Sequence, residues 1–174
     1  MNNSPLISVI IPTRNGHATI ARAIRSVLDQ SHSNIEIIIV SDHRLDNEKD
    51  KASADALRDL IKSEFPEQYG EHAAKQNTNR KIRIVDGFAT GPGAARNLGI
   101  KSSASESEFA AFLDDDDIWS DANKLTAQLK TLQDVPDLYV TGCPTVFFVD
   151  EKGQPQKTVT QPTDPVAIND QMII

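Results

Sequence analysis

The segment Phe109-Ala-Ala-Phe-Leu-Asp-Asp-Asp-Asp-Ile-Trp119 decides the fold and the site of this chain. Its apolar first half is bounded by polar sequence and predicts a short buried strand, so the four carboxylates fall where that strand leaves the sheet. Adjacent aspartates repel one another and raise one another's pKa, a cost that a divalent cation or solvent relieves. Carboxylates are hard oxygen ligands that suit Mg2+, Mn2+ or Ca2+, so the four aspartates indicate a metal site. The alternative interpretation is a solvated acidic turn that caps the next helix.

Upstream of this segment, strand-like and helix-like stretches alternate. Runs rich in β-branched residues predict strands at Leu6–Thr13, Ile35–Val40 and Ile82–Val85. Apolar residues at helical spacing predict helices over about 17–30 and 49–64, and a glycine-rich loop at 90–93 runs into another helix. This alternation predicts an α/β, Rossmann-like, mostly parallel sheet with helices on both faces.

Three further expectations concern loops and the C-terminal part. Polar residues 66–80 lack periodicity and read as a surface loop. Leucine spacing predicts a helix from about Asp121, with Ser120 as its N-cap. Residues 139–149 read as a strand, and the turn signal at 150–155 predicts a hairpin.

Composition limits the class of protein. Lys and Arg number 18 against 25 Asp and Glu, a net charge of −7, and the basic residues form no tract, which argues against nucleic acid as a partner. The single cysteine, Cys143, excludes an internal disulfide and favours the cytoplasm. The apolar run from Leu6 to Ile11 stops at Pro12 and is too short to span a membrane.

In parallel sheets ligands bind beyond the carboxyl ends of the strands. This rule gathers four separate segments on one rim: Pro12–Asn15, Asp42, Gly91–Arg96 and Asp114–Asp117. Asp42 is suited to accept a hydrogen bond from a base or to cap its own loop. The turn at Gly91–Gly93 presents helix amides to a phosphate, and Arg96 is placed to pair with one unless it is simply solvated. Together they describe a nucleoside diphosphate held by a cation.

The sharpest competitor is a dinucleotide-dependent oxidoreductase fragment, because Gly91-x-Gly93-x-x-Arg96 has roughly the spacing of a Rossmann fingerprint. Against it, Arg96 stands at the third glycine position, and a ribose needs one carboxylate where four are present. Nothing marks Cys143 as a nucleophile. A non-catalytic, metal-dependent nucleotide-binding module is the other alternative.

Taken in order, these motifs resemble the nucleotide-binding part of family-2 inverting glycosyltransferases with the GT-A fold. The resemblance covers about residues 6–155. Its motifs are the opening strand and turn SVIIPTRN at Ser8–Asn15, the strand IIIVSD at Ile37–Asp42, the helix start GAARNLG at Gly93–Gly99, the DXD segment FLDDDDIW at Phe112–Trp119, and the hairpin VDEKG at Val149–Gly153.

The resemblance implies a role for each matching position. Pro12 and Arg14 would flank the base, Asp42 would bind the base edge, and Arg96 would approach the diphosphate or donor sugar. Asp114 would lie near the ribose and donor sugar, and Asp116 would bind the Mn2+ or Mg2+ that bridges the phosphates. The implied set of nucleotide-sugar-binding residues is therefore Pro12, Arg14, Asn15, Asp42, Arg96, Asp114 and Asp115.

The implied reaction transfers a sugar, from UDP-sugar by preference, to a polysaccharide, lipid or protein acceptor with inversion. The chain departs from the family at three places. Arg14 replaces an aromatic residue that stacks on the base, Ser41 replaces the first of two aspartates, and His43-Arg44 replaces Gly-Ser. The 66–80 loop also looks longer than usual.

We expect residues 1–174 to be one GT-A domain of a longer enzyme, with 1–120 as the nucleotide-binding part and 121–174 as the start of the acceptor side. The family places its catalytic base well after the DXD segment, so we expect that base beyond Ile174. The expected location is the cytoplasm, with peripheral attachment to the inner face of the membrane as an extension of it.

Overall fold

The computed structural model describes residues 4–44, 46–70, 80–88, 91–135, 138–142, 145–149 and 155–160. The chain forms two compact units, residues 1–126 and 127–174. Along the chain the elements are β1 (Leu6–Thr13), α1 (Ile20–Leu28), β2 (Ile35–Ser41), α2 (Glu48–Glu64), β3 (Arg80–Asp86), α4 (Pro92–Lys101), β4 (Ser107–Phe112), α5 (Lys124–Asp134), β5 (Thr145–Val149) and β6 (Pro155–Thr160).

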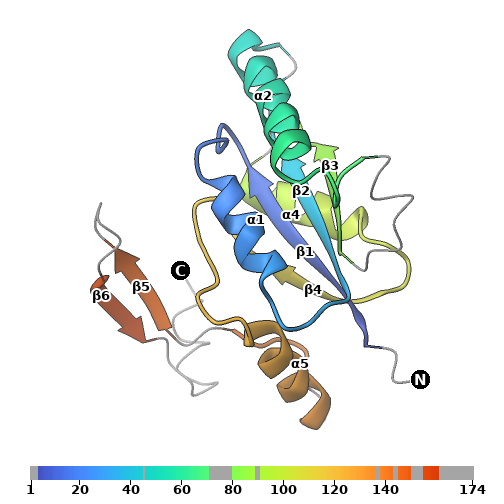
Figure 1. Ribbon diagram of the computed structural model, residues 1–174, viewed down its shortest axis with the longest axis vertical. Helices are drawn as coiled ribbons and strands as arrows, with labels where there is room; N and C mark the ends of the chain where they lie inside the picture. Colours follow the sequence, from blue (N-terminus) through green and yellow to red (C-terminus); the bar gives the residue numbers. More distant parts are fainter. Residues whose placement is uncertain are drawn as a thin grey trace. The chain divides into compact units, whose positions relative to one another are not determined.

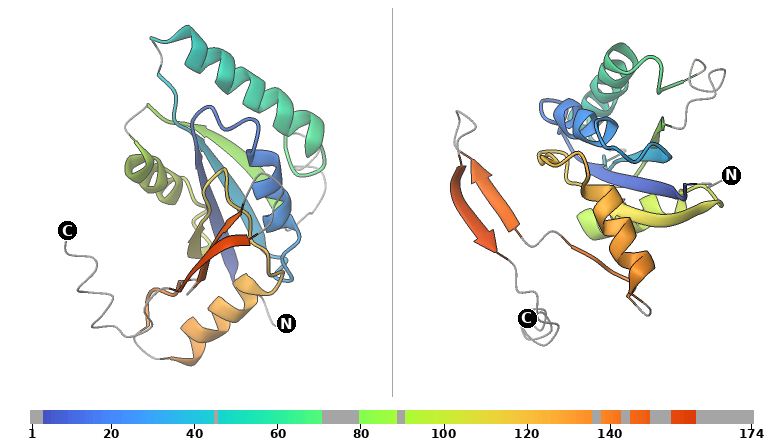
Figure 2. Two further views of the ribbon diagram at one scale, coloured as in Figure 1. Left: turned by 90° about the vertical axis from the view of Figure 1, so that its left-hand side faces the viewer. Right: turned by 60° about the horizontal axis from the view of Figure 1, so that its bottom comes forward.

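The first unit is built on a four-stranded sheet in the order β3-β2-β1-β4. Every neighbouring pair in it is parallel. Helices α1 and α2 cover one face of the sheet and α4 covers the other (Figures 1 and 2). The predicted α/β architecture with helices on both faces is therefore confirmed.

The two central strands are buried along almost their whole length because helices cover both faces. Side chains of β1 alternate between the two faces. Val9 and Ile11 belong to the cluster that contains Ile24 of α1 and Ile61 of α2. Ile10 instead packs with the residues that face α4, which include Ala95. One strand thus anchors both halves of the core.

Helix α4 comes unusually close to β1. A Cβ added at Gly99 would overlap the Cγ2 methyl of Ile10, so only glycine lets the helix backbone lie at this distance. Gly99 and Ala95, one turn apart, are both buried on the face that meets the sheet. The close packing fixes the position of the α4 N-terminus at the rim of the sheet.

The prediction of a buried strand at 109–113 is wrong in its burial. Strand β4 alternates between partly buried and exposed residues, and Phe112 is 45% exposed. Among the described strands, β4 pairs with β1 alone and so lies at the edge. The carboxylates nevertheless begin directly after the strand, as predicted, with buried Leu113 between Phe112 and Asp114.

The predicted helix after the acidic loop is present as α5, but it begins at Lys124 rather than at about Asp121, so Ser120 is not its cap. The side chain of Gln30 interrupts the helical pattern. Its amide nitrogen donates to the Asp121 carbonyl (2.9 Å) and its oxygen accepts from the Leu125 amide (3.1 Å). These two backbone groups would have bonded each other in a continuing helix.

The remaining predictions differ mainly in their bounds. Strand β3 starts at Arg80, earlier than predicted, because it pairs with β2 along its whole length. Of the predicted strand at 139–149, Thr145–Val149 is a strand, whereas the described residues 139–142 lack regular structure. In the second unit β5 and β6 pair antiparallel, which confirms the hairpin, although its turn at 150–154 and Cys143 lie outside the described residues. No helix in the described ranges is long and apolar enough to cross a membrane.

Candidate functional site

The loops that follow the strands of the first unit meet at one edge of the sheet. Thr13, Ser41 and Asp86 are the last residues of β1, β2 and β3 and are in register with one another. The backbone holds the emerging loops together, because Asp42 N–H donates to the Thr13 carbonyl (2.9 Å) and Gly87 N–H donates to the Ser41 carbonyl (2.8 Å). The loops after β1, β2 and β3 therefore meet at one edge, the edge at which the sequence predicts the rim.

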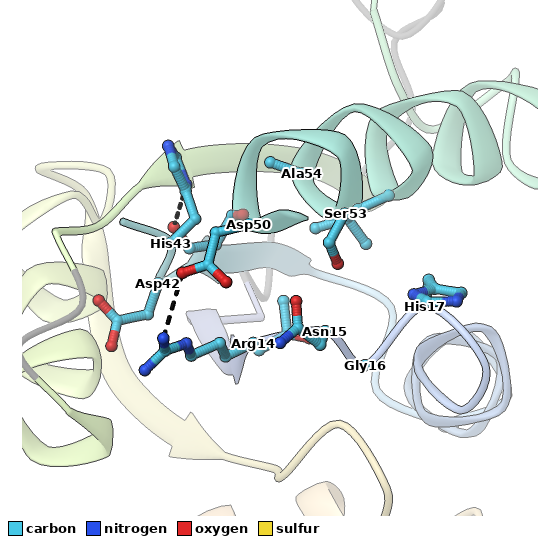
Figure 3. A pocket seen from close by; sticks show the side chains of 12 residues that line it. Arg14, Asn15, Gly16, His17, Asp42, His43, Asp50, Ser53 and Ala54 are labelled. Atoms are coloured by element: carbon cyan, nitrogen blue, oxygen red, sulfur yellow. Dashed lines mark hydrogen bonds and ion pairs between the residues drawn. The ribbon is translucent and has the colours of Figure 1, made fainter. Parts of the chain in front are cut away.

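A pocket opens between the loop after β1, the loop after β2 and the start of α2 (Figure 3). Arg14, Asn15 and Asp42 of the predicted set line this pocket. Asn15 has a φ of 63°, a left-handed conformation that asparagine tolerates better than most residues. Pro12 is buried in β1 and does not line the pocket.

Asp42 joins the end of β2 to the start of α4. Its side chain is only 6% exposed, and one carboxylate oxygen accepts from the Gly91 amide (3.1 Å). Gly91 is the N-cap residue of α4 and has a φ of 96°, which favours glycine. A Cβ at Gly87 would lie 2.9 Å from the other oxygen of Asp42, so this glycine makes room for the carboxylate. Asp42 therefore links the predicted base site to the predicted phosphate loop.

Arg96 and Asp114 form an ion pair between α4 and the acidic loop, with Nη2 and Oδ1 2.5 Å apart. Their side chains are 33% and 49% exposed, so solvent screens the pair and its contribution to stability is small. The pair orients the Arg96 side chain. A guanidinium has several N–H donors, so others remain for a ligand when one is engaged.

The second aspartate of the acidic loop points inward. The Thr13 hydroxyl donates a hydrogen bond to Asp115 Oδ2, and Gly16 lies so close that a Cβ there would overlap this oxygen. Burial raises the pKa of Asp115, the Thr13 hydrogen bond opposes this shift, and the charges of Asp116 and Asp114 add to it. Thr13 thereby ties the loop after β1 to the acidic loop.

The last two aspartates of the loop face solvent. Partial burial of its carboxyl group, and then the charges of Asp116 and Asp114, raise the pKa of Asp117. No hydrogen bond or ion pair engages the Asp116 carboxylate among the residues that the structure describes. The Asp116 and Asp117 carboxylates are thus the two members of the loop that are open to an external ligand.

These residues form no preformed metal cage. Within the described ranges, no three His, Cys, Asp or Glu side chains converge to hold a metal ion. Mg2+ is commonly held by one or two carboxylates together with the phosphates of a substrate, and such a site is incomplete until the nucleotide arrives. An exposed Asp116 beside the Arg96–Asp114 pair fits this second kind of site.

Two residues at the rim escaped the sequence interpretation. The sequence pattern places Thr13 in a strand and turn, with no further role. It places Asp50 in the 49–64 helix, although this residue lies on the buried face with Ala54, Leu57 and Ile61. A carboxylate at helical spacing with apolar residues was the signal that could have identified it.

Replacing Thr13 by valine is expected to lower the free energy of unfolding by about 1 kcal/mol, because a partly buried carboxylate loses its donor while the shape of the side chain is kept. Urea denaturation without metal measures this. The control is Thr126→Val, since the Thr126 hydroxyl bonds Ser31 at an exposed site (2.8 Å) and water can replace it. Equal losses in the two variants would argue against the link between the loops.

Comparison with known proteins agrees with this geometry. The family model described as Glycosyl transferase family 2 matches residues 8–172. An uncharacterized glycosyltransferase of Rickettsia bellii is 32% identical over 148 residues, which cover 85% of this chain and 18% of that protein. The UDP-Glc:alpha-D-GlcNAc-diphosphoundecaprenol beta-1,3-glucosyltransferase WfgD of Escherichia coli is 32% identical over 127 residues, 73% of this chain and 41% of its own.

Among solved structures, the mannosyltransferase PcManGT of Pyrobaculum calidifontis, in complex with GDP-Man and Mn2+, has a TM-score of 0.55. At 18% identity over 75% of this chain and 33% of that one, it shares the GT-A fold. The chain spans less than half the length of each of these relatives. The match of the family model over residues 8–172 nonetheless shows that the chain belongs to glycosyl transferase family 2, the family that its ordered motifs resemble.

Proposed function

We propose that the first unit binds the nucleoside diphosphate of a sugar donor, UDP-sugar by preference, together with a divalent cation. The observation that carries this proposal is the chain of contacts around the rim. Asp42 contacts Gly91 at the start of α4, Arg96 of α4 contacts Asp114, and Asp115 contacts Thr13 beside the pocket. The pocket that contains Arg14 and Asp42, a helix N-terminus and a carboxylate loop are thus joined in one continuous surface.

The preference for uracil rests on hydrogen-bonding groups. Uracil presents an N–H between two carbonyl oxygens, so it matches a carboxylate acceptor such as Asp42 combined with a guanidinium donor such as Arg14. Cytosine carries an unprotonated nitrogen where uracil has the N–H, and that nitrogen would face the carboxylate unfavourably. The name of WfgD specifies UDP-Glc as the donor, which supports the same choice.

In this proposal Asp116 would hold Mn2+ or Mg2+, which would supply positive charge to offset the charge on the departing nucleoside diphosphate. Arg96, oriented by Asp114, adds positive charge near the same phosphates. Inversion also needs a carboxylate to deprotonate the acceptor hydroxyl. The acceptor is a carbohydrate, a lipid-linked sugar or a protein, and we place the reaction in the cytoplasm, at the inner face of the membrane when the acceptor is lipid-linked.

Calorimetric titration with UDP tests the donor site. UDP is expected to bind in the presence of Mn2+ and not in EDTA, CDP to bind at least tenfold more weakly, and NAD not to bind. Metal-independent binding of NAD would instead favour the dinucleotide-dependent alternative. Release of UDP from UDP-glucose with Mn2+ then separates a transferase from a non-catalytic nucleotide-binding module, which would bind the donor without cleaving it.

A further inference from the structure

Asp50 carries a buried carboxylate that has no role in the proposed donor site. It lies in the first turn of α2, is 4% exposed, and lines the pocket that contains Arg14 and Asp42. Its Oδ2 atom accepts from the Arg14 guanidinium (3.1 Å) and from the Arg44 amide (2.9 Å). Figure 3 shows Arg14 reaching toward the side of the pocket where Asp50 and Asp42 lie.

Helix α2 does not need the Asp50 side chain to begin. Its N-cap is Asn47, whose side-chain oxygen already accepts from the Lys49 and Asp50 amides. A carboxylate so near an apolar face costs free energy unless it is paired. The Asp50 side chain is therefore paired away from its own helix, with the loops that follow β1 and β2.

The Arg14 side chain is 46% exposed at the mouth of the pocket, while its partner Asp50 is buried. A free arginine there would lose considerable rotamer freedom on binding a ligand, so a fixed carboxylate that restrains it before binding raises affinity. Among the described residues, Asp50 is the one partner of the guanidinium, which it engages through Nη2. The planar group keeps other N–H donors and both of its faces for a base.

We propose that Asp50 is a positioning residue for donor recognition: it holds Arg14 in place to contact the base of the nucleotide. The inference rests on the proposed function, since it assigns Arg14 to the nucleoside half of the donor. It also gives a physical reason for an arginine in place of an aromatic residue, because a guanidinium offers both a stacking plane and hydrogen-bond donors once it is restrained.

The test compares UDP and inorganic pyrophosphate as ligands, each titrated with Mn2+. Asp50→Asn, which keeps an acceptor for the Arg44 amide, is expected to weaken UDP binding about tenfold, and Arg14→Ala at least as much. In the double variant UDP binding should be no weaker than in Arg14→Ala alone. Pyrophosphate affinity should stay unchanged in all three, because the lost contact belongs to the base.

Asp59→Asn is the matched control, as the same change on an exposed position of the same helix, and wild-type UDP affinity is expected for it. Additive losses in the double variant, or an equal loss of pyrophosphate affinity, would show a merely structural role and overturn the inference. Arg14→Ala leaves α2 intact, so unchanged UDP affinity in that variant overturns the inference even if Asp50→Asn does not fold. Failure of the wild-type chain to bind UDP with Mn2+ would instead refute the donor proposal itself.

Discussion

Asp116→Ala is expected to abolish the Mn2+-dependent binding of UDP. The carboxylate is exposed and unengaged among the described residues, so its removal leaves the fold intact and takes away the ligand that we assign to the cation. Without that ligand the repulsion between the diphosphate and the remaining aspartates is no longer offset. UDP affinity in Mn2+ should fall at least a hundredfold, to the level found in EDTA.

Asp117→Ala is the matched control, because it removes the same charge one residue further along the loop. It should weaken binding only several-fold, since it changes the charge of the loop and not the metal ligand in this proposal. A solvated acidic turn without a metal role predicts small and similar effects for both variants. Equal affinities of the two for UDP in Mn2+ would remove Asp116 from the site.

Gly99→Val is expected to cause the largest loss of stability, about 3 kcal/mol in the free energy of unfolding. The new side chain would overlap Ile10 in the middle of a buried strand, and helix α4 would have to move away from the sheet. Urea denaturation followed by circular dichroism measures the change. Because α4 carries Arg96 and follows Gly91, a displaced helix should also weaken UDP binding.

The same substitution at Gly93 separates packing from helix propensity. Gly93 lies in the same helix, and nothing stands within 4 Å of a Cβ placed there. Gly93→Val should therefore change the free energy of unfolding by less than about 1 kcal/mol. Comparable losses of unfolding free energy at both positions would mean that Ile10 or helix α4 can move to accommodate the new side chain with little loss of stability.

The parts of the fold that the sequence predicted are those governed by local pattern. Strands β1 and β2 are mostly apolar runs, and their parallel pairing follows from the helix α1 between them. The rim followed from the same topology, because parallel strands end on one side. The edge position of β4 was not predictable in this way, since it depends on how many strands pair beyond it.

The errors come from contacts between residues that are distant in the sequence. Nothing near Asp121 in the sequence indicates that the Gln30 side chain will donate a hydrogen bond to the Asp121 carbonyl. Similarly, four consecutive aspartates look alike until Thr13 orients one and Arg96 another. The assignment of Asp115 to nucleotide-sugar binding stays a prediction, although its carboxylate faces Thr13 and Gly16.

The hydrogen bond between Thr13 and Asp115 joins residues 102 positions apart in the chain. During synthesis on the ribosome, β1 and its loop emerge long before the acidic loop. Parallel pairing of such distant strands is slow, because the entropy of closing a long loop is lost before the contacts between the strands form. The site is therefore among the last parts of the first unit to form, and a nascent chain that ends before residue 115 has a pocket wall but no acidic loop to complete it.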